Sequence, residues 1–298
     1  MELKSLSTFI EIAKTKPKKS IAVVAAEDEP VLKAVSAAKS EGIADPILIG
    51  NEEKIRQIAE SIQFDLGGVE IIDELEPANS ALRAVKLIRD GKAQILMKGH
   101  VGTADYLKAV LNKEYGLRTG SLLSHVGFFE TDSYHKVIAV SDAAQNVAPE
   151  LPEKVQIIKN CADMYHRLGV DNPKIALLAA IEGVNHKMSA TMDAAAITMM
   201  NRRSQIKGCL IDGPLALDNA ISKEAAGHKG IKSDVAGDAD LLFAPNIEVA
   251  NVLYKSLTYF GGAAVAAVIL GAAVPVVLTS RADSDRSKML SLALAASY

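Results

Sequence analysis

Short apolar runs alternate with amphipathic segments along almost the whole chain of 298 residues. The runs are rich in Val and Ile and are bounded by Gly, Pro and Asp, a pattern that predicts buried strands. The predicted strands span residues 21–26, 46–49, 69–72, 94–97, 122–129, 136–141, 175–181, 208–211, 240–244 and 274–279.

The segments between these runs carry apolar residues on one helical face. Three of them, each followed at once by a glycine, span residues 29–41, 77–90 and 152–168. Glycine just past the last periodic residue is the expected signal for a helix C-terminus. Regular alternation of strands and helices predicts an α/β fold with mostly parallel strands.

The longest apolar run spans residues 263–278 and is interrupted by Gly271 and Pro275. It is too short and too broken to cross a bilayer, so we interpret it as helix, turn and strand, with an Ala-rich helix over residues 253–268. Residues 1–19 lack the continuous apolar stretch of a signal peptide. We therefore expect a cytoplasmic protein that does not bind membranes.

Composition and missing motifs exclude several function classes. A net charge of −3, no Trp and 4% aromatic residues argue against nucleic-acid binding. The two cysteines, Cys161 and Cys209, and the six histidines show no metal-ligand spacing, so we expect no bound metal. Walker A, GxGxxG and GxSxG motifs are absent, which removes the usual signatures of nucleotide-driven phosphoryl transfer, dinucleotide redox chemistry and covalent serine catalysis.

Chemistry concentrates directly after the last predicted strand. Ser280 and Arg281 follow it at once, and Asp283 and Asp285 lie within the next four residues. Open α/β sheets bind ligands at the carboxyl ends of their strands, where a hydroxyl, a guanidinium and a carboxylate can bind an anion and move a proton. The structural alternative is a strand end with a salt-bridging Arg and an Asp or Ser as helix N-cap.

Two further junctions between strand and helix could bind an anion through free N–H groups. One holds Lys98, His100 and Thr103 among glycines, and its alternative is a tight turn with Thr103 as N-cap. The other spans residues 182–185.

Two positively charged features are weaker candidates for contacts with an anionic ligand. Asn251 and Lys255 are four residues apart and share a helix face, as a solvated pair would also do. The loop 227–232 is locally basic and could also contact an anionic ligand.

Seven segments occur in an order that resembles one known family. They are KGHVGTADYLK at 98–108, SDAAQN at 141–146, AIEGVNHKMSAT at 180–191, DGPLALDNA at 212–220, HKGI at 228–231, NVLYK at 251–255 and PVVLTSRAD at 275–283. Together they resemble the phosphate acetyl/butyryltransferase family, and its butyryl branch more than its acetyl branch. The resemblance covers nearly the whole chain.

The resemblance implies a cytoplasmic enzyme of short-chain fatty acid metabolism that converts acyl-CoA and phosphate reversibly to acyl phosphate and CoA. It implies coenzyme A as a substrate, no bound cofactor and no metal, a butyryl or branched acyl group, and a homodimer or higher homo-oligomer. It also implies two three-layer α/β domains with a cleft between them, of the isocitrate/isopropylmalate dehydrogenase type. With a joint near residues 142–152, domain I comprises residues 1–141 plus 283–298, closed by the C-terminal helix, and domain II comprises residues 142–282.

By the same resemblance, Ser280 donates to an oxyanion, Arg281 binds phosphate and a carboxylate serves as base. We favour Asp283 as the base over Asp285, with an N-cap role as the competing reading of Asp283. In acetyl-type members the catalytic aspartate falls at the position of Ser287. The phosphate- or CoA-binding candidates are Lys98, His100, Thr103, Lys108, Asn146, Asn251 and Lys255, and Lys108 stands where acetyl-type members use an arginine.

Three other functions remain open from the sequence. One is a phosphate acetyltransferase of the same family. Another is an NAD-dependent decarboxylating dehydrogenase, which would need carboxylates for Mg²⁺ or Mn²⁺ that we do not find at matching strand ends. The third is a catalytically weakened protein that binds acyl-CoA or acyl phosphate.

Overall fold

The computed structural model of the protein describes residues 1–278 and 283–298. Two compact units form: unit 1 comprises Met1–Leu6 and Leu122–Val265, and unit 2 comprises Ser7–Ser121 and Ala266–Tyr298. Ser280 and Arg281 lie outside the described residues. Among the described residues, no helix combines the length and the apolar character needed to cross a membrane.

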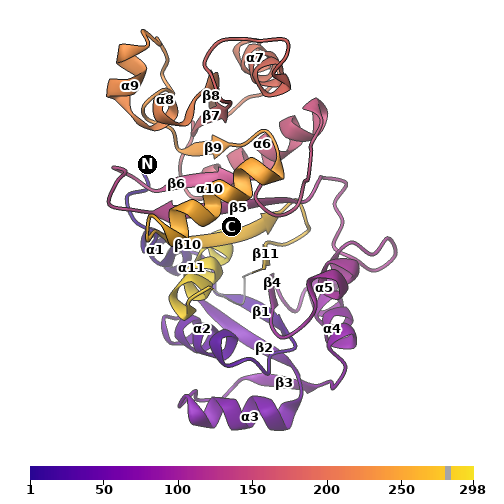
Figure 1. Ribbon diagram of the computed structural model, residues 1–298. Coiled ribbons are helices and arrows are strands. Elements are labelled where there is room, and N and C mark those ends of the chain that lie inside the picture. Colours follow the sequence, from indigo (N-terminus) through magenta and orange to yellow (C-terminus); the bar gives the residue numbers. More distant parts are fainter. Residues whose placement is uncertain (279–282) are drawn as a thin grey trace. The chain divides into compact units, whose positions relative to one another are not determined.

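Unit 2 is a sheet with helices on both faces (Figure 1). Its strands are β1 (Lys19–Val24), β2 (Ala44–Gly50), β3 (Glu70–Asp73), β4 (Ile95–Lys98), β10 (Ala264–Leu270) and β11 (Val276–Val277), in the order β3-β2-β1-β4-β11-β10. All neighbours in it are parallel except β10 and β11, which are antiparallel.

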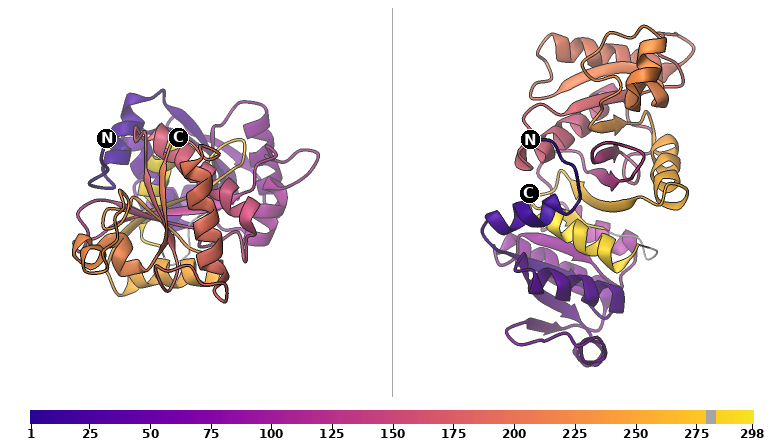
Figure 2. Two further views of the ribbon diagram at one scale, coloured as in Figure 1. Left: turned by 90° about the horizontal axis from the view of Figure 1, so that it is seen from above. Right: turned by 90° about the vertical axis from the view of Figure 1, so that its left-hand side faces the viewer.

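The helices of unit 2 divide between the two faces of its sheet. Helices α1 (Thr8–Thr15), α2 (Glu29–Ser40) and α11 (Asp285–Ala296) pack together on one face, as the right-hand view of Figure 2 shows. The opposite face carries α4 (Pro77–Arg89) and α5 (Thr103–Val110), and α3 (Glu52–Ser61) lies by β3. Because α11 belongs to this unit, the unit is discontinuous in sequence.

Unit 1 has the strand order β5-β6-β9-β7-β8. The strands are β5 (Ser124–Glu130), β6 (Ile138–Ser141), β7 (Lys174–Leu178), β8 (Leu210–Leu215) and β9 (Leu241–Phe243). Strands β5 and β6 pair antiparallel, and the other neighbours in this order pair parallel. The helices are α6 (Leu151–Arg167), α7 (Ser189–Arg202), α8 (Leu217–Ile221), α9 (Lys223–His228) and α10 (Ile247–Tyr259).

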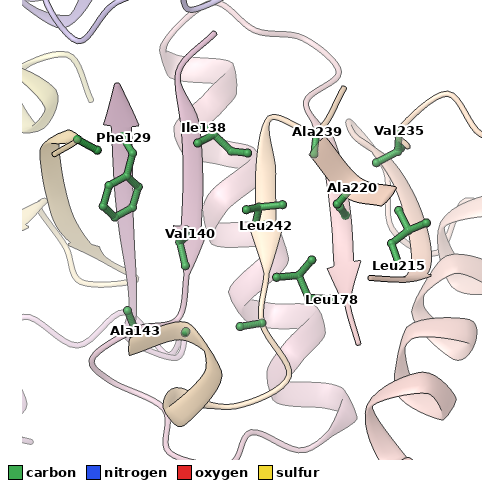
Figure 3. Packing of buried hydrophobic residues seen from close by; sticks show 14 of the residues in the cluster. Phe129, Ile138, Val140, Ala143, Leu178, Leu215, Ala220, Val235, Ala239 and Leu242 are labelled. Atoms are coloured by element: carbon green, nitrogen blue, oxygen red, sulfur yellow. The ribbon is translucent and has the colours of Figure 1, made fainter. Parts of the chain in front are cut away.

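A hydrophobic cluster joins the strands of unit 1 to its helices. Phe129, Val140, Leu178 and Leu242, from strands β5, β6, β7 and β9, contribute side chains that are at most 6% exposed (Figure 3). Burial of such apolar surface contributes about 25 cal/mol per Å² and is the main term that holds helices on a sheet.

The helix predictions are largely confirmed. Helices α2, α4 and α6 begin and end within one residue of the predicted spans. Gly42, Gly91 and Gly169 follow them with φ of 73°, 73° and 83°, a conformation that side chains other than glycine's resist.

The predicted helix over residues 253–268 is wrong in its second half. Helix α10 ends at Tyr259, and Ala264–Leu270 forms strand β10, buried along almost its whole length. An apolar run that is buried all round has no periodicity that separates strand from helix. Gly261 and Gly262, the latter at φ 60°, end the helix.

The two observed units have different boundaries from the predicted domains. The predicted boundaries lay between residues 141 and 142 and between residues 282 and 283. The hairpin of β5 and β6 belongs to unit 1 because β6 pairs with β9. The chain enters unit 2 again at Ala266, within β10, and β11 then pairs with β4. The first six residues belong to unit 1, where Leu3 O accepts a hydrogen bond from Val137 N at 2.8 Å.

Candidate functional site

The carboxyl ends of β1, β4 and β11 lie side by side in unit 2. Val277 is the last residue of β11 and pairs with Met97, one residue before the end of β4. The chain then passes through residues 279–282, which the structure does not describe, and continues at Asp283. The sequence candidates Ser280 and Arg281 belong to this segment, three and four residues after Val277 in the sequence.

The connection from β4 to α5 passes tightly over the end of β1. Gly99 N donates to Val24 O at 2.8 Å, and His100 N donates to Ala25 O at 2.7 Å. A Cβ atom on Gly99 would lie 2.4 Å from both of these carbonyl oxygens, so no larger residue fits without movement. Close backbone approach is one reason for a glycine at a ligand-binding edge.

A buried hydroxyl holds the end of β1 in an unusual conformation. Ala25 has φ 47°, which is uncommon for a residue with a side chain. Ser80, on α4 and fully buried, accepts from Ala25 N at 2.8 Å and donates to Ile49 O at 3.1 Å. Backbone strain of this kind persists only where neighbours enforce it, and it is frequent at functional sites.

The structure brings three sequence candidates together at this edge. Lys98 is 8% exposed and its ammonium donates to Gly99 O at 3.3 Å, so it is a largely desolvated cation at a strand end. His100 is exposed, with Nδ1 3.9 Å from Asp28 Oδ2. Thr103 is the first residue of α5 and is exposed, whereas Gly102 is the N-cap, so the predicted N-cap role of Thr103 is wrong.

Helix α5 also carries Lys108, which is exposed and has no side-chain partner among the residues described. It lies five residues, roughly 7–8 Å, along the helix from Thr103. Tyr106 fixes the helix on the sheet, because its buried hydroxyl donates to Leu96 O at 3.3 Å. Burial raises the pKa of Tyr106 well above its ordinary value, so it remains a neutral anchor.

The two carboxylate candidates differ in their surroundings. The N-cap of α11 is Ser284, whose hydroxyl accepts from Ser287 N at 3.1 Å, so the helix does not use Asp283 as its cap. Asp283 is half-buried, and its carbonyl accepts from the buried Lys288 at 2.5 Å. Asp285 is exposed and lines a groove between α1, α2 and α11.

The remaining candidates lie in unit 1, around the turn that follows β6. Asn146 donates to Leu123 O at 2.8 Å and to Asp142 Oδ2 at 2.5 Å, so both amide hydrogens stabilise the turn itself. Asn251 donates to Ala143 O at 3.1 Å. Lys255 is exposed one helical turn further along α10. Asn146 and Asn251 thus both stabilise the turn after β6 through hydrogen bonds within the protein.

The junction at residues 182–185 precedes its helix by several residues, because α7 begins only at Ser189. Glu182 pairs with Lys229 at 3.0 Å, so the basic loop 227–232 has an acidic partner within unit 1. Hydrogen bonding by Lys229 is the leading cause that lowers the pKa of Glu182.

An apolar cavity of about 760 Å³ lies in unit 1, against the carboxyl ends of β7 and β9. Helices α7, α8 and α10 complete its walls, through Met188, Leu217 and Val249 among others. Of the described residues that line it, Glu248 alone is ionisable. A negative charge in an apolar wall does not favour phosphate, so this cavity is not the anion site.

One group in the described part of the chain could share a cation: Glu2, His135 and Asp238 offer ligand atoms within 4.8 Å of one another. Asp238 Oδ1 already lies 2.8 Å from His135 Nε2 and 3.1 Å from Lys136 Nζ, and its Oδ2 lies 2.5 Å from Lys174 Nζ. Two ammonium groups on one carboxylate repel a metal ion. We assign this cluster to an ion-pair network.

Neither cysteine suits nucleophilic chemistry. Burial is the leading cause that raises the pKa of Cys161 to about 12 and that of Cys209 to about 11. A thiol acts as nucleophile through its thiolate, which is scarce at neutral pH for such groups.

The sequence and fold match one family throughout. Residues 5–81 and 75–296 match the family described as phosphate acetyl/butaryl transferase. The phosphate butyryltransferase of Clostridium acetobutylicum is 49% identical over 294 residues, which cover 99% of this chain and 98% of that protein. The phosphate acetyltransferase of Thermotoga maritima is 44% identical over 98% of this chain and 99% of its own length. The chain belongs to this family.

Solved structures agree with this membership. A branched-chain phosphotransacylase from Enterococcus faecalis V583 superposes with a TM-score of 0.83 at 36% identity, covering 93% of this chain and 97% of that one. A 4-hydroxythreonine-4-phosphate dehydrogenase from Burkholderia phymatum, with a TM-score of 0.55 at 16% identity over 95% of this chain and 98% of that chain, shows the shared fold alone. The predicted family, the α/β fold of the isocitrate dehydrogenase type and the acyltransferase class are confirmed.

As a member of the phosphate acetyl/butyryl transferase family, the chain is a phosphate acyltransferase of a CoA-dependent class. The sequence interpretation missed Ser80 and Ala25, which shape the edge where Lys98 lies. One signal was available: Ser80 stands on the apolar face of α4 with Ala84, Leu87 and Ile88. A serine in a buried stripe must find a hydrogen-bond partner.

Proposed function

We propose that this chain transfers a butyryl or branched short-chain acyl group reversibly between coenzyme A and inorganic phosphate. The observation that carries the proposal is the 49% identity with a phosphate butyryltransferase over 99% of the chain. We place the catalytic site at the carboxyl ends of β1, β4 and β11. The largely buried Lys98 ends β4, which pairs with β11, and the segment with Ser280 and Arg281 comes after β11 in the sequence.

In the direction of acyl-CoA synthesis, Asp283 takes the proton from the CoA thiol in a complex that also holds acyl phosphate. The thiolate forms a C–S bond to the acyl carbonyl carbon, and the C–O bond to phosphate then breaks. The phosphate leaves with the electron pair. General-base catalysis by a positioned carboxylate accounts for about 10²–10⁴-fold in rate.

Ser280 is proposed to donate to the oxyanion that forms on the carbonyl oxygen, which is worth about 10²–10³-fold in kcat. Arg281 is proposed to neutralise the phosphate through a paired contact. Lys98, at the end of β4, and Lys108, on α5, are proposed to add further positive charge for the phosphate. No step requires a metal ion or a bound cofactor.

Acetyl transfer is the second candidate, favoured by the 44% identity with a phosphate acetyltransferase over 98% of the chain. Apolar pockets distinguish one methylene by roughly 1–3 kcal/mol, so a butyryl pocket should show a clear preference over acetyl.

The test measures CoA release from butyryl-CoA and acetyl-CoA with a thiol reagent, with chelator present and no nucleotide. We expect release that depends on phosphate, with kcat/KM at least about tenfold higher for butyryl-CoA. A preference for acetyl-CoA would select the second candidate. A folded protein that releases CoA from neither would contradict both and favour a binding protein.

We also propose a homodimer in the cytoplasm, with α10 in the contact. Val252 is 65% exposed, Tyr259 72% and Phe260 93%, so apolar and aromatic side chains face outward along this helix and its end. Large exposed apolar patches are typical of protein interfaces.

A further inference from the structure

A groove of about 510 Å³ lies on unit 2, where α4 ends and the chain turns after α5. Leu82, Lys86, Arg89, Asp90 and Tyr115 line it. Helix α4 begins near the carboxyl edge, where Ser80 contacts Ala25, and its 13 residues span about 20 Å. Lys86, Arg89 and Asp90 lie six to ten residues, roughly 9–15 Å, beyond Ser80, so the charged part of the groove is separate from the proposed catalytic edge.

Two charges in this groove have no partner in the described part of the chain. Neither the Lys86 ammonium nor the Asp90 carboxylate has a side-chain hydrogen bond or ion pair among those residues. Leu82 is 37% exposed and Tyr115 40% exposed, so the same groove presents apolar and aromatic surface to solvent.

The charged side chains that line the groove are mostly basic. Lys86 and Arg89 outnumber Asp90, whereas the whole chain has a net charge of −3. Local positive charge of this kind raises the concentration of anionic ligands near it.

The backbone of the turn that carries Tyr115 is held in place before any ligand arrives. Asn112 Oδ1 accepts from Glu114 N at 2.8 Å and from Tyr115 N at 3.0 Å. Arg89 Nη1 donates to Glu114 O at 2.6 Å, which ties the turn to α4. A Cβ on Gly116 would lie 2.3 Å from Asn112 O, so only glycine fits this turn. A preorganised wall reduces the entropy that binding must overcome.

We propose that this groove binds an adenosine phosphate. The adenine ring packs on Tyr115 and Leu82, its amino group donates to Asp90, and the phosphate contacts Lys86 and Arg89. Bases stack on aromatic side chains, and carboxylates accept hydrogen bonds from exocyclic amines.

Two molecules carry this chemistry: free adenine nucleotides and coenzyme A, whose far end is an adenosine 3′-phosphate. If the ligand is CoA, the inference rests on the proposed function, and the long pantetheine arm extends along α5 toward the catalytic edge. The eight residues of α5 span about 12 Å.

The test is calorimetric titration of adenosine 3′,5′-bisphosphate, AMP and CoA into the wild-type protein and four variants. Lys86→Gln and Tyr115→Ala should each weaken adenosine bisphosphate binding about tenfold, because a charge-assisted contact or a stacked ring is lost. Tyr115→Phe keeps the ring and should bind like the wild type. Lys54→Gln, an exposed lysine on α3, is the matched control.

Parallel weakening of CoA binding, with a similar rise in KM for acyl-CoA, would identify CoA as the ligand. Weakening of AMP and bisphosphate binding alone would identify a free nucleotide. Failure of both nucleotide probes to bind at millimolar concentration, or equal affinities in all five proteins, would overturn the site. CoA release by the wild type, measured in the same preparation, shows separately whether the proposed function holds.

Discussion

Gly99 lies where two strand ends leave no room for a side chain. We expect Gly99→Ala to lower the free energy of unfolding by about 1–3 kcal/mol, because the added Cβ would lie 2.4 Å from two carbonyl oxygens. Urea denaturation measures this change. Gly227→Ala is the control: Gly227 is exposed in α9, a Cβ there would have no atom within 4 Å, and the variant should be no less stable. Equal midpoints for Gly99→Ala and wild type would contradict the close approach.

At the scale of single residues, local sequence predicted what depends on neighbours in the chain. Lys98 and His100 follow a strand, and the structure places them at its carboxyl end as expected. The hydrogen bond from Ala25 N to Ser80 joins residues 55 apart, so no local pattern could reveal it. The roles of Ser280 and Arg281 stay predictions, because both lie outside the described residues.

Strand β10 and helix α11 are joined by one buried hydroxyl. Ser291 Oγ accepts from Ala267 N at 2.9 Å and donates to Ser287 O at 2.8 Å. We expect Ser291→Ala to cost about 1–3 kcal/mol in urea unfolding, because a buried N–H loses its acceptor. Ser61→Ala removes an exposed hydroxyl at the end of α3 and should change stability by less than about 0.5 kcal/mol. A similar small effect for Ser291→Ala would show that the strand does not need this contact.

The amino ends of β6, β7 and β9 are joined by the ion pairs of Asp238. Burial raises the pKa of Asp238, but hydrogen bonds from Lys174, His135 and Lys136 outweigh it and hold the pKa well below its usual range. A lowered folded-state pKa gives stability that is present above the unfolded-state pKa, about 3.9, and is lost as the pH falls below it.

Asp238→Asn should therefore have a lower free energy of unfolding than wild type at neutral pH. The gap between the two free energies should narrow by about 1 kcal/mol between about pH 7 and about pH 3. Urea unfolding at both pH values measures it. Asp132→Asn, which changes an exposed carboxylate, should track the wild type at both. A difference for Asp238→Asn that is constant with pH would refute the lowered pKa.

At the scale of elements, amphipathic helices with glycine at their ends were predictable from periodicity. Strand β10 was not, because Ala264–Leu270 is buried along almost its whole length and shows no polar face. Strand β11 has two residues, so its extent was overestimated from a longer apolar run. Pairing partners distant in sequence decided both outcomes.

At the scale of the whole molecule, one substitution that introduces a charge on α10 tests the proposed dimer contact. Val252→Glu places a carboxylate on the exposed side of this helix, and burial of an unpaired charge in an interface is costly. We expect sedimentation equilibrium to show a dimer for wild type and a weakened one for the variant. Glu224→Gln, which changes an exposed carboxylate on α9, should sediment like wild type. An unchanged dimer in Val252→Glu would place the contact elsewhere.

The family was predictable because its motifs occur in order from residue 98 to residue 283, and a match of residues 5–81 and 75–296 confirms it. The limits of the compact units were not predictable, because they depend on which strands pair. Leu122–Val265 includes β6, which pairs with β9, and Ala266–Tyr298 includes β11, which pairs with β4.

The central claim is that the edge of β1, β4 and β11 catalyses phosphate-dependent acyl transfer with Asp283 as base. The most direct measurement is kcat for CoA release from butyryl-CoA and phosphate in wild type, Asp283→Asn and Asp285→Asn. We predict a fall of about a hundredfold or more for Asp283→Asn, given the usual contribution of a general base. Asp285→Asn should stay within a few-fold of wild type, because Asp285 lines the groove of α1 and α2. An unchanged kcat in a folded Asp283→Asn would contradict the account, and a loss confined to Asp285→Asn would move the base to that residue.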